Sequence, residues 1–518
     1  MIDVKKIVQA TTVVTAITLV VKGLGFVEKL LLAYFFGTGS QVDAYLVAYS
    51  LPFSAFVVLR EVVKPAFLPT FLRTLRTSKR DGWHLFSVVG TVLLILLTAA
   101  TAAGIVFAEP LISLAAPGFG GEQRTLTVTL TRLIMPALLL LGLSTLTTAA
   151  LNAQKRFTRP ALGDASYRAG PLALLLLLGS IPAMTVGASL GALGKLVIET
   201  WGLGKYLRQL RLTLNVTFAP AKTVFRLAAP LLAALSLSLF VAPLVENAFA
   251  SQVGVGGVAA LAYSRKIAET LTTILPYTLG LVLLPFSADM AASQEYDALA
   301  RTLSSAVRVL TLIFLPVTLG LMVLREPFVR LLFERGAFDA ASTQLTAGPL
   351  LFYALALLPF ALEVIVVQFF FARQDTLTPV IADVVTFALN VALIPPLRGV
   401  LGLGGIALAA AVAKGLKVLA LLLLFDRQVP AFRLARLGPF AGQMILASLV
   451  ASGVLGALLA AGAKLGAGGM GGLLVYLAAG GVLGGGAFYL TAYLLRVDEI
   501  RDLWQRALQV GQALLSRQ

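Results

Sequence analysis

Cysteine is absent from this 518-residue chain, and histidine occurs once, at His84. Without cysteine there is no disulfide, thiolate metal site or cysteine nucleophile, and one histidine builds neither a catalytic triad nor an HExxH zinc site. His84 follows a basic loop and is interpreted as a polar residue at a helix start. Charge is also scarce, because only 13% of residues are charged, against about 25% in soluble proteins. The composition indicates a polytopic membrane protein, not a soluble enzyme with an anchor, and we expect no enzymatic activity.

Apolar residues are abundant instead: 58% of the chain is hydrophobic, and the mean hydropathy is +0.92. Runs of about 20 apolar residues, bounded by Gly, Pro and charge, are typical of transmembrane helices. The chain is therefore predicted to be an all-α polytopic membrane protein with about fourteen spans. The predicted spans are residues 7–35, 43–69, 84–108, 126–152, 160–179, 181–204, 222–249, 258–287, 299–324, 342–372, 377–397, 401–425, 439–462 and 470–495.

The net charge of +17 would suggest a nucleic-acid partner in a soluble chain. Here most Lys and Arg fall in short loops on one side of the predicted membrane, as the positive-inside rule describes. Opposite loops such as 36–42 and 250–257 carry almost none, and the segment 325–335 is the exception. We therefore expect a multi-pass protein with both termini in the cytoplasm and no nucleic-acid partner.

The two halves of the chain repeat short strings, in the same order and at a near-constant spacing. The repeat predicts two pseudo-symmetric six-helix lobes, related by an axis along the membrane normal, with a central site between them. The paired strings are Ala48-Tyr49-Ser50 with Ala262-Tyr263-Ser264, Leu68-Pro69 with Leu284-Pro285, Glu109-Pro110 with Glu326-Pro327, and NAQKRFTRP (152–160) with FARQDTLTP (371–379). The predicted parts are an N-lobe (1–220), a C-lobe (221–430), helices 13 and 14 (431–496) and an amphipathic cytoplasmic tail (497–518).

Both lobes carry cations in their leading spans, where charge is costly. Helical spacing puts Lys22 and Lys29 on one face and Arg60 and Lys64 on another. Facing one cavity, such cations would bind a phosphate or pyrophosphate, which Arg grips bidentately and Lys as a point charge. The alternative is that they reach the membrane interface or pair with nearby glutamates. The candidate anion-site residues are Lys22, Lys29, Arg60, Lys64, Arg265 and Lys266, and the candidate gate or coupling residues are Glu28, Asp43 and Glu269.

Two of these gate or coupling residues have a structural interpretation as well. Asp43 stands where a cap or first-turn acid is expected, and Glu269 is spaced to pair with Arg265. Other polar residues inside predicted spans are candidates for a coupling cation, whose site the sequence does not locate. They are Asp164, Arg168, Glu246, Glu363, Gln368, Asp383 and Asn390.

The pattern KGLGFxxKxxxAxxFGxGxxxDAYxxAYxLP, from Lys22 to Pro52, resembles the opening helices of the MurJ/MviN family. YSRKIAETLTTILPYTLGLVLLP and FFFARQDTLTPV are similar to later family segments, so the resemblance covers roughly residues 6–425. The family comprises lipid II flippases of the multidrug/oligosaccharidyl-lipid/polysaccharide exporter superfamily. It implies a bacterial inner-membrane transporter with no cofactor, and a cationic cavity for an undecaprenyl-diphosphate-linked saccharide. It also implies a lipid-tail groove along helices 13 and 14, and alternating access.

Carried over by position, Lys22 stands where the family has an essential Arg, and Asp43, Lys266 and Glu269 match family residues. The chain departs from the pattern at two places. Glu28, with Lys29 beside it, replaces a second Arg, and the Arg pair after the second-helix Leu-Pro is absent, leaving Arg60 as the nearest cation. A lipid II flippase is therefore the first hypothesis. The alternatives are a flippase for another polyprenyl-diphosphate-linked oligosaccharide, a cation-coupled multidrug antiporter, and a non-transporting scaffold. The sequence indicates no oligomeric state.

Overall fold

The computed structural model describes residues 4–464 and 469–500. Every regular element in these ranges is helical, which confirms the predicted all-α membrane fold. The chain divides into two compact units, and each is described by itself. Unit 1 comprises residues 1–260 with 335–339, and unit 2 comprises 261–334 with 340–518. The predicted amphipathic tail lies, from residue 501 onward, outside the described residues.

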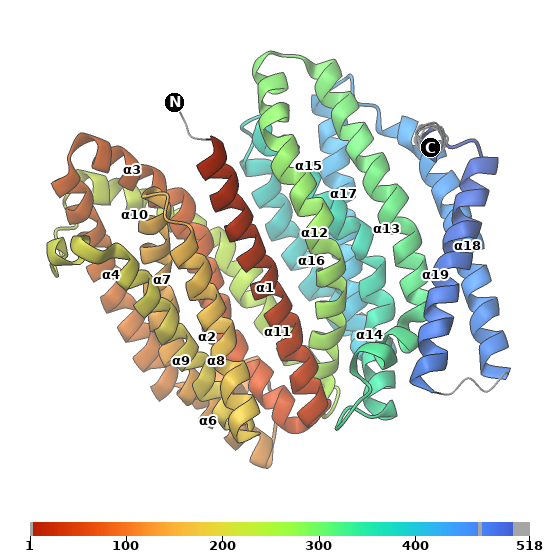
Figure 1. The fold of residues 1–518 in the computed structure, drawn as a ribbon, viewed down its shortest axis with the longest axis horizontal. Helices are drawn as coiled ribbons and strands as arrows, with labels where there is room; N and C mark the ends of the chain where they lie inside the picture. The colour runs from red at the N-terminus through yellow and green to blue at the C-terminus, as the bar shows by residue number, and fades with distance from the viewer. Residues whose placement is uncertain (1–3, 465–468, 501–518) are drawn as a thin grey trace, which may run out of the picture. The chain divides into compact units, whose positions relative to one another are not determined.

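Unit 1 holds the first eleven α-helices, a 3₁₀ turn and a π turn (Figure 1). The α-helices are α1 (Val4–Phe36), α2 (Ser40–Ala66), α3 (Leu68–Thr77), α4 (Lys79–Val106), α5 (Ala108–Ala115), α6 (Gly121–Ile134), α7 (Pro136–Ala153), α8 (Thr158–Leu178), α9 (Ile181–Leu203), α10 (Ala219–Ser236) and α11 (Ala242–Ser251), with η1 (Gly204–Gln209) and η2 (Leu237–Val241).

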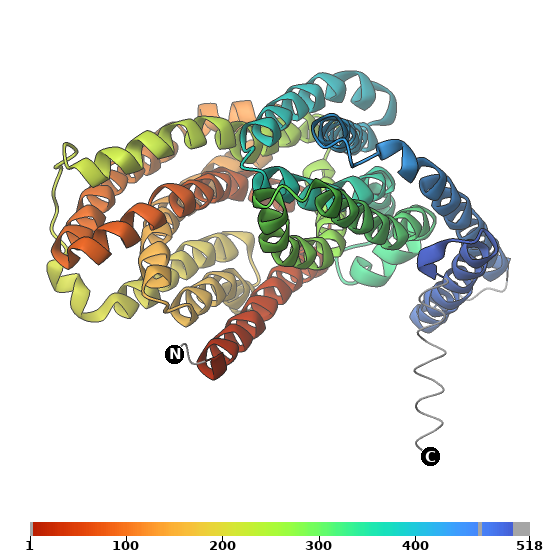
Figure 2. The same ribbon diagram turned by 90° about the horizontal axis from the view of Figure 1, so that it is seen from above.

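Unit 2 contains the remaining helices, and α18 and α19 run side by side in both ribbon views (Figure 2). The helices are α12 (Gly257–Ala292, whose first four residues belong to unit 1), α13 (Tyr296–Phe333), α14 (Ala340–Leu355), α15 (Leu357–Ala372), α16 (Leu377–Leu401), α17 (Leu403–Gln428), α18 (Gly438–Lys464) and α19 (Met470–Leu494), with the 3₁₀ turn η3 (Leu434–Leu437).

Eleven helical segments of the described chain are long and apolar enough to cross a membrane, or twelve if α14 and α15, bent by 41°, form one broken span. The predicted count of fourteen is not confirmed. The other two predicted spans correspond to α1 and α8, which are helices of 33 and 21 residues. Each has charged residues within its length, such as Lys22 and Glu28 in α1 and Asp164 and Arg168 in α8.

Close backbone contact joins α8 to α9 in unit 1. A Cβ atom added to Gly187 would lie 2.5 Å from the carbonyl oxygen of Gly170, and one on Gly191 would lie 2.7 Å from that of Tyr167. Only glycine permits this approach. The two helices therefore pack close enough for polar side chains to meet across their interface.

Bulky apolar side chains fill the interior of each unit. In unit 1, Phe67, Phe71 and Trp83 are buried in one cluster. In unit 2, the ring of Phe425 lies edge-on to Phe370 and Phe432. The predicted helices 13 and 14 exist as α18 and α19, which pack on α13.

The helices α10 and α11 belong to unit 1, whose main segment ends at Ala260. Within that unit, α10 packs against α2. Spatial grouping is a different property from internal repetition. The lobe boundaries at 220 and 430, and the lipid-tail groove, stay predictions.

Candidate functional site

One face of α2 carries a row of aromatic rings. Tyr45, Tyr49, Phe53 and Phe56 follow helical spacing, so they share this face. Their ring centroids are 5.7, 5.0 and 6.1 Å apart in succession. The hydroxyl of Tyr49 also lies 2.8 Å from that of Tyr167 on α8, which fixes the row against a second helix.

Three cations lie over these rings. The Lys29 ammonium is 5.9 Å from the Tyr49 centroid, the Arg168 guanidinium is 5.8 Å from Phe53, and the Arg60 guanidinium is 5.8 Å from Phe56. Cations within about 6 Å of a ring face are attracted to it by about 0.5 to 2 kcal/mol. We call Lys29, Arg168 and Arg60 the cationic row. It draws on α1, α8 and α2 within unit 1.

The Glu28 carboxylate is the counter-ion at one end of the row. Its Oε2 atom accepts a hydrogen bond from Arg168 Nη1 at 3.3 Å, and its Oε1 atom lies 3.8 Å from Lys29 Nζ. The Glu28 side chain is 2% exposed, whereas Arg168 is 27% exposed. Two cations therefore share one buried carboxylate, and Arg168 keeps part of its surface accessible. A gating or coupling role for Glu28 stays a prediction.

Arg60 and Lys64 occupy the next turns of α2. Arg60 is 55% exposed and pairs with the adjacent Glu61 at 3.1 Å, as the structural alternative expected. Exposed pairs of this kind contribute about 0 to 1 kcal/mol. Lys64 is exposed one turn further along, and Lys22 is exposed on α1 two turns before Lys29. Both lie outside the row of cations over the α2 rings.

Asp43 is completely buried in the first turn of α2. Its Oδ2 atom accepts a hydrogen bond from the Gly256 N–H at 2.6 Å, and its Oδ1 atom accepts one from the Ala259 N–H at 2.7 Å. These donors lie at the start of α12, so Asp43 caps a helix that is remote in sequence. The expected capping role is found, but on another helix than α2. The alternative role as an outer gate stays a prediction.

The remaining candidates lie in unit 2, on α12. Arg265 Nε is 3.9 Å from Glu269 Oε1, which confirms the predicted i,i+4 pairing. Arg265 and Lys266 are half-buried, and Glu269 is exposed. Their participation in one site with the unit 1 cations stays a prediction.

Sequence reasoning did not place Arg168 among the anion-site residues, although it named Arg168 as a polar group inside a span. The only signal was a guanidinium in the middle of an apolar helix. Two lysines inside spans were also missed. Lys195 in unit 1 and Lys417 in unit 2 each contact two carboxylates.

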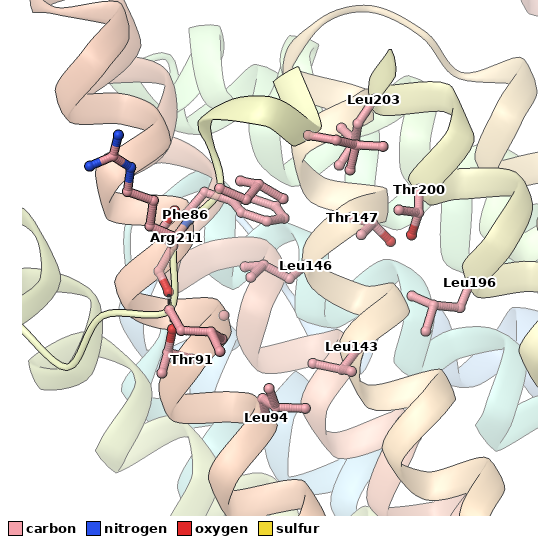
Figure 3. Close-up of a pocket in the computed structure, with 15 residues that line it drawn as sticks. Phe86, Thr91, Leu94, Leu143, Leu146, Thr147, Leu196, Thr200, Leu203 and Arg211 are labelled. Atoms are coloured by element: carbon pink, nitrogen blue, oxygen red, sulfur yellow. Dashed lines mark hydrogen bonds between the residues drawn. The ribbon is translucent and has the colours of Figure 1, made fainter. Parts of the chain in front are cut away.

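A cavity of about 400 Å³ lies elsewhere in unit 1, between α4, α7 and α9 (Figure 3). Leucines line most of it, among them Leu94, Leu143 and Leu196. The segment after η1 closes one side, because the N–H groups of Arg211 and Thr213 donate to the hydroxyls of Ser87 and Thr91 at 3.2 and 3.0 Å. Figure 3 shows the Arg211 guanidinium directed away from these leucines. The cavity is apolar and separate from the cationic row.

Residues 32–477 match the protein family described as Lipid II flippase MurJ. The chain is 29% identical over 407 residues to a probable lipid II flippase MurJ of Rhizobium meliloti (strain 1021), covering 75% of each chain. It is also 29% identical over 397 residues to the lipid II flippase MurJ of Burkholderia cenocepacia, covering 72% of this chain and 74% of the relative.

The fold is similar to solved structures of two transporter groups. A lipid II flippase MurJ in an inward closed conformation matches with a TM-score of 0.76 and 20% identity, covering 95% of this chain and 99% of that one. An inward-facing multidrug resistance MATE family transporter of the MOP superfamily matches with a TM-score of 0.68 and 13% identity, covering 79% and 94%. These likenesses establish the fold, and the family match covers most of the sequence. The chain belongs to the lipid II flippase MurJ family.

Proposed function

We propose that this protein moves an undecaprenyl-diphosphate-linked saccharide, and lipid II first of all, from the cytoplasmic to the outer leaflet of the bacterial inner membrane. Membership of the MurJ family supports the substrate class. The observation that carries the proposal in this chain is the cationic row held over the α2 rings. The process is transport by alternating access, in which no bond is made or broken.

The chemistry of the row suits a diphosphate. Arg168 presents a guanidinium that grips phosphate oxygens bidentately, and Lys29 adds a compact charge beside it. Arg168 shares the Glu28 carboxylate with Lys29 and keeps part of its surface accessible, so an incoming diphosphate can reach the guanidinium. Lys22, Lys64, Arg265 and Lys266 would supplement this charge as the head group moves.

A release step follows from the position of Glu28. Because its carboxylate contacts Arg168, it would compete with the diphosphate for the guanidinium and limit residence of the bound lipid. Glu28 would thereby act as the gate, with Asp43 and Glu269 as secondary candidates. We propose membrane potential or a cation gradient as the energy source, no bound cofactor, and membrane lipids as the surrounding partners. Both termini would lie in the cytoplasm.

The multidrug alternative is not favoured, because the family match is to MurJ and a cationic row would repel cationic drugs. The main competing hypothesis is a flippase for another polyprenyl-diphosphate-linked oligosaccharide. Glu28 and Arg60 mark the places where the chain departs from the arginines of the family pattern, so the contacts to the head group would differ from the family arrangement.

The test is complementation of a bacterial strain depleted of its own lipid II flippase. The wild-type chain should restore growth, and Arg168→Ala should not. Arg124→Ala is the matched control, because Arg124 is a cation of unit 1 that pairs with Glu109 and lies outside the row. Failure of the wild-type chain to rescue at normal membrane levels would reject lipid II as the substrate. Transport of another polyprenyl-diphosphate-linked saccharide by that same chain would then support the competing hypothesis.

A further inference from the structure

A lysine is buried between two carboxylates inside unit 1. Lys195 Nζ on α9 lies 2.7 Å from Asp164 Oδ1 on α8 and 2.7 Å from Glu199 Oε1 one turn along α9. The Lys195 side chain is 4% exposed and Glu199 is completely buried. The hydroxyls of Thr147 and Thr148 on α7 donate to the same Glu199 carboxylate at 2.5 and 2.9 Å. This Lys195 cluster joins three helices.

Unit 2 has a lysine in the same situation. Lys417 Nζ on α17 contacts Glu363 on α15 and lies 2.5 Å from Asp383 Oδ1 on α16. Its side chain is 1% exposed. Lys414, one turn earlier, adds a second ammonium 2.8 Å from Glu363 Oε2. This Lys417 cluster also joins three helices.

The two clusters occupy corresponding places in the internal repeat. Asp164 follows the start of the repeated string 152–160 at the same distance at which Asp383 follows the start of 371–379. The spacing of the two aspartates pairs Lys195 with Lys414, and Lys417 follows one turn later on α17. The second carboxylate differs, because Glu199 lies on the helix of its lysine and Glu363 lies on α15. In both units the aspartate lies on the earlier helix of a hairpin, α8 or α16, and the lysine lies on the later helix, α9 or α17. An arrangement present in both halves is unlike a chance pairing.

The geometry is that of an oxygen site for a cation, filled by the protein's own ammonium. Hard cations take carboxylate and carbonyl oxygens as ligands, and here the carboxylate oxygens surround Nζ. Within residues 4–464 and 469–500, no group of three or more acidic, histidine or cysteine side chains could hold a metal ion. A buried carboxylate left without its partner is strongly destabilising. The lysine ammonium groups neutralise these carboxylates without an exchangeable ion.

We propose that Lys195 and Lys417 are tethered cations, each filling between two carboxylates the place that an exchangeable coupling ion would otherwise occupy. Asp164, Glu363 and Asp383 are then not coupling-ion ligands in the native chain. Any ion that drives transport acts elsewhere. The tethered cations hold the helices of each unit together whatever substrate is transported.

The two clusters should respond differently to loss of the tether. The Lys195 cluster has one cation and two carboxylates, so removing the lysine leaves two negative charges and two threonine hydroxyls. Removing Lys417 leaves Lys414 in place, so the Lys417 cluster then keeps one cation and two carboxylates. Lys195→Ala therefore creates the stronger vacant cation site. Asp164 is 53% exposed, so small ions have a route inward.

The experiment measures thermal unfolding of the purified full-length protein in detergent. Wild type, Lys195→Ala and Lys195→Met are compared in sodium, methylammonium and N-methylglucamine chloride at one ionic strength. Lys195→Ala should unfold at a lower temperature than wild type in N-methylglucamine. It should regain about 2 to 3 °C in sodium or methylammonium at a concentration about a hundredfold above the dissociation constant. Lys195→Met fills the space without charge and should regain much less.

Equal responses of Lys195→Ala and wild type to the three cations would overturn the inference. A second comparison keeps the test decisive if Lys195→Ala fails to fold. Wild type and Asp164→Asn are compared in sodium and N-methylglucamine. Under the inference, any sodium stabilisation of wild type persists in Asp164→Asn. Its loss in that variant would show that the site takes an exchangeable ion, and would reject the tethered cation.

Discussion

The Arg168 guanidinium on α8 lies 3.3 Å from the Glu28 carboxylate on α1, and this ion pair ties together two helices that are far apart in sequence. It also fixes the middle of the cationic row, because Arg168 lies over Phe53, between Lys29 over Tyr49 and Arg60 over Phe56. A diphosphate that binds Arg168 must compete with Glu28. The first prediction follows from this competition.

Glu28→Gln should bind the diphosphate more tightly and transport it more slowly. The amide keeps the shape of the side chain but removes the charge that competes for Arg168. We expect affinity for undecaprenyl diphosphate to rise by about tenfold, equivalent to about 1.4 kcal/mol. Binding to the purified protein and transport in proteoliposomes are measured together. Unchanged or weaker binding would contradict a releasing role for Glu28.

Phe53→Leu should weaken binding without unfolding unit 1. Leucine keeps an apolar side chain under Arg168 but removes the ring face, which contributes about 0.5 to 1 kcal/mol at partly exposed sites. A loss of about two- to fivefold in affinity for undecaprenyl diphosphate is expected. Phe107→Leu is the control, because Phe107 is 58% exposed and outside the row. Equal behaviour of the two variants would indicate that the rings serve packing alone.

Asp43→Asn should lower stability by about 1 to 3 kcal/mol, because a buried N–H group loses its partner. The amide places one acceptor oxygen where the carboxylate has two, so it cannot accept from both Gly256 and Ala259 as Asp43 does. Thermal unfolding in detergent measures the loss, with transport followed at a temperature where the variant is folded. Normal stability with abolished transport would favour the gate interpretation over capping.

Asp375 gives a pH-dependent contribution in the loop before α16, outside the spans. Partial burial acts to raise the pKa of its carboxyl, but hydrogen bonds from the side chain and N–H of Thr378 outweigh this and hold the pKa below its ordinary value. A depressed pKa stabilises the folded state above the unfolded pKa, and the gain is lost as pH falls through the folded pKa.

Wild type should therefore be more stable than Asp375→Ala at neutral pH, with a difference that shrinks below about pH 4. Unfolding of both proteins from neutral to acidic pH measures it. Asp297→Ala, at the start of α13, is the comparison for general acid effects. A difference that grows on acidification would contradict the assignment.

The helices could be predicted from apolar runs, because a bilayer requires long apolar segments whatever their partners are. The Arg265–Glu269 pair was equally accessible, since both residues lie on one helix at i,i+4. The relative position of two residues on one helix follows directly from their spacing in the sequence. The weakest predictions were α1 and α8, where charges interrupt the apolar run.

Contacts between distant helices could not be predicted from spacing. Arg168 and Glu28 are 140 residues apart, and Asp43 and Gly256 are 213 residues apart. Spacing places each residue along its own helix but does not say which helix lies beside it. The repeat could have predicted one correspondence between the two halves, because Asp164 and Asp383 have the spacing of the repeated strings 152–160 and 371–379.

Transport of lipid II in proteoliposomes tests the central proposal most directly. Purified wild type, Arg168→Ala and Arg124→Ala are reconstituted, and the fraction of labelled lipid II that changes leaflet is followed with time. We predict transport by wild type and Arg124→Ala. With lipid II below saturation, the rate for Arg168→Ala should be at least about tenfold lower, because loss of about 1.4 kcal/mol of binding lowers the occupancy of the site about tenfold. Absence of transport by folded wild type, or equal rates for Arg168→Ala and wild type, would contradict the account.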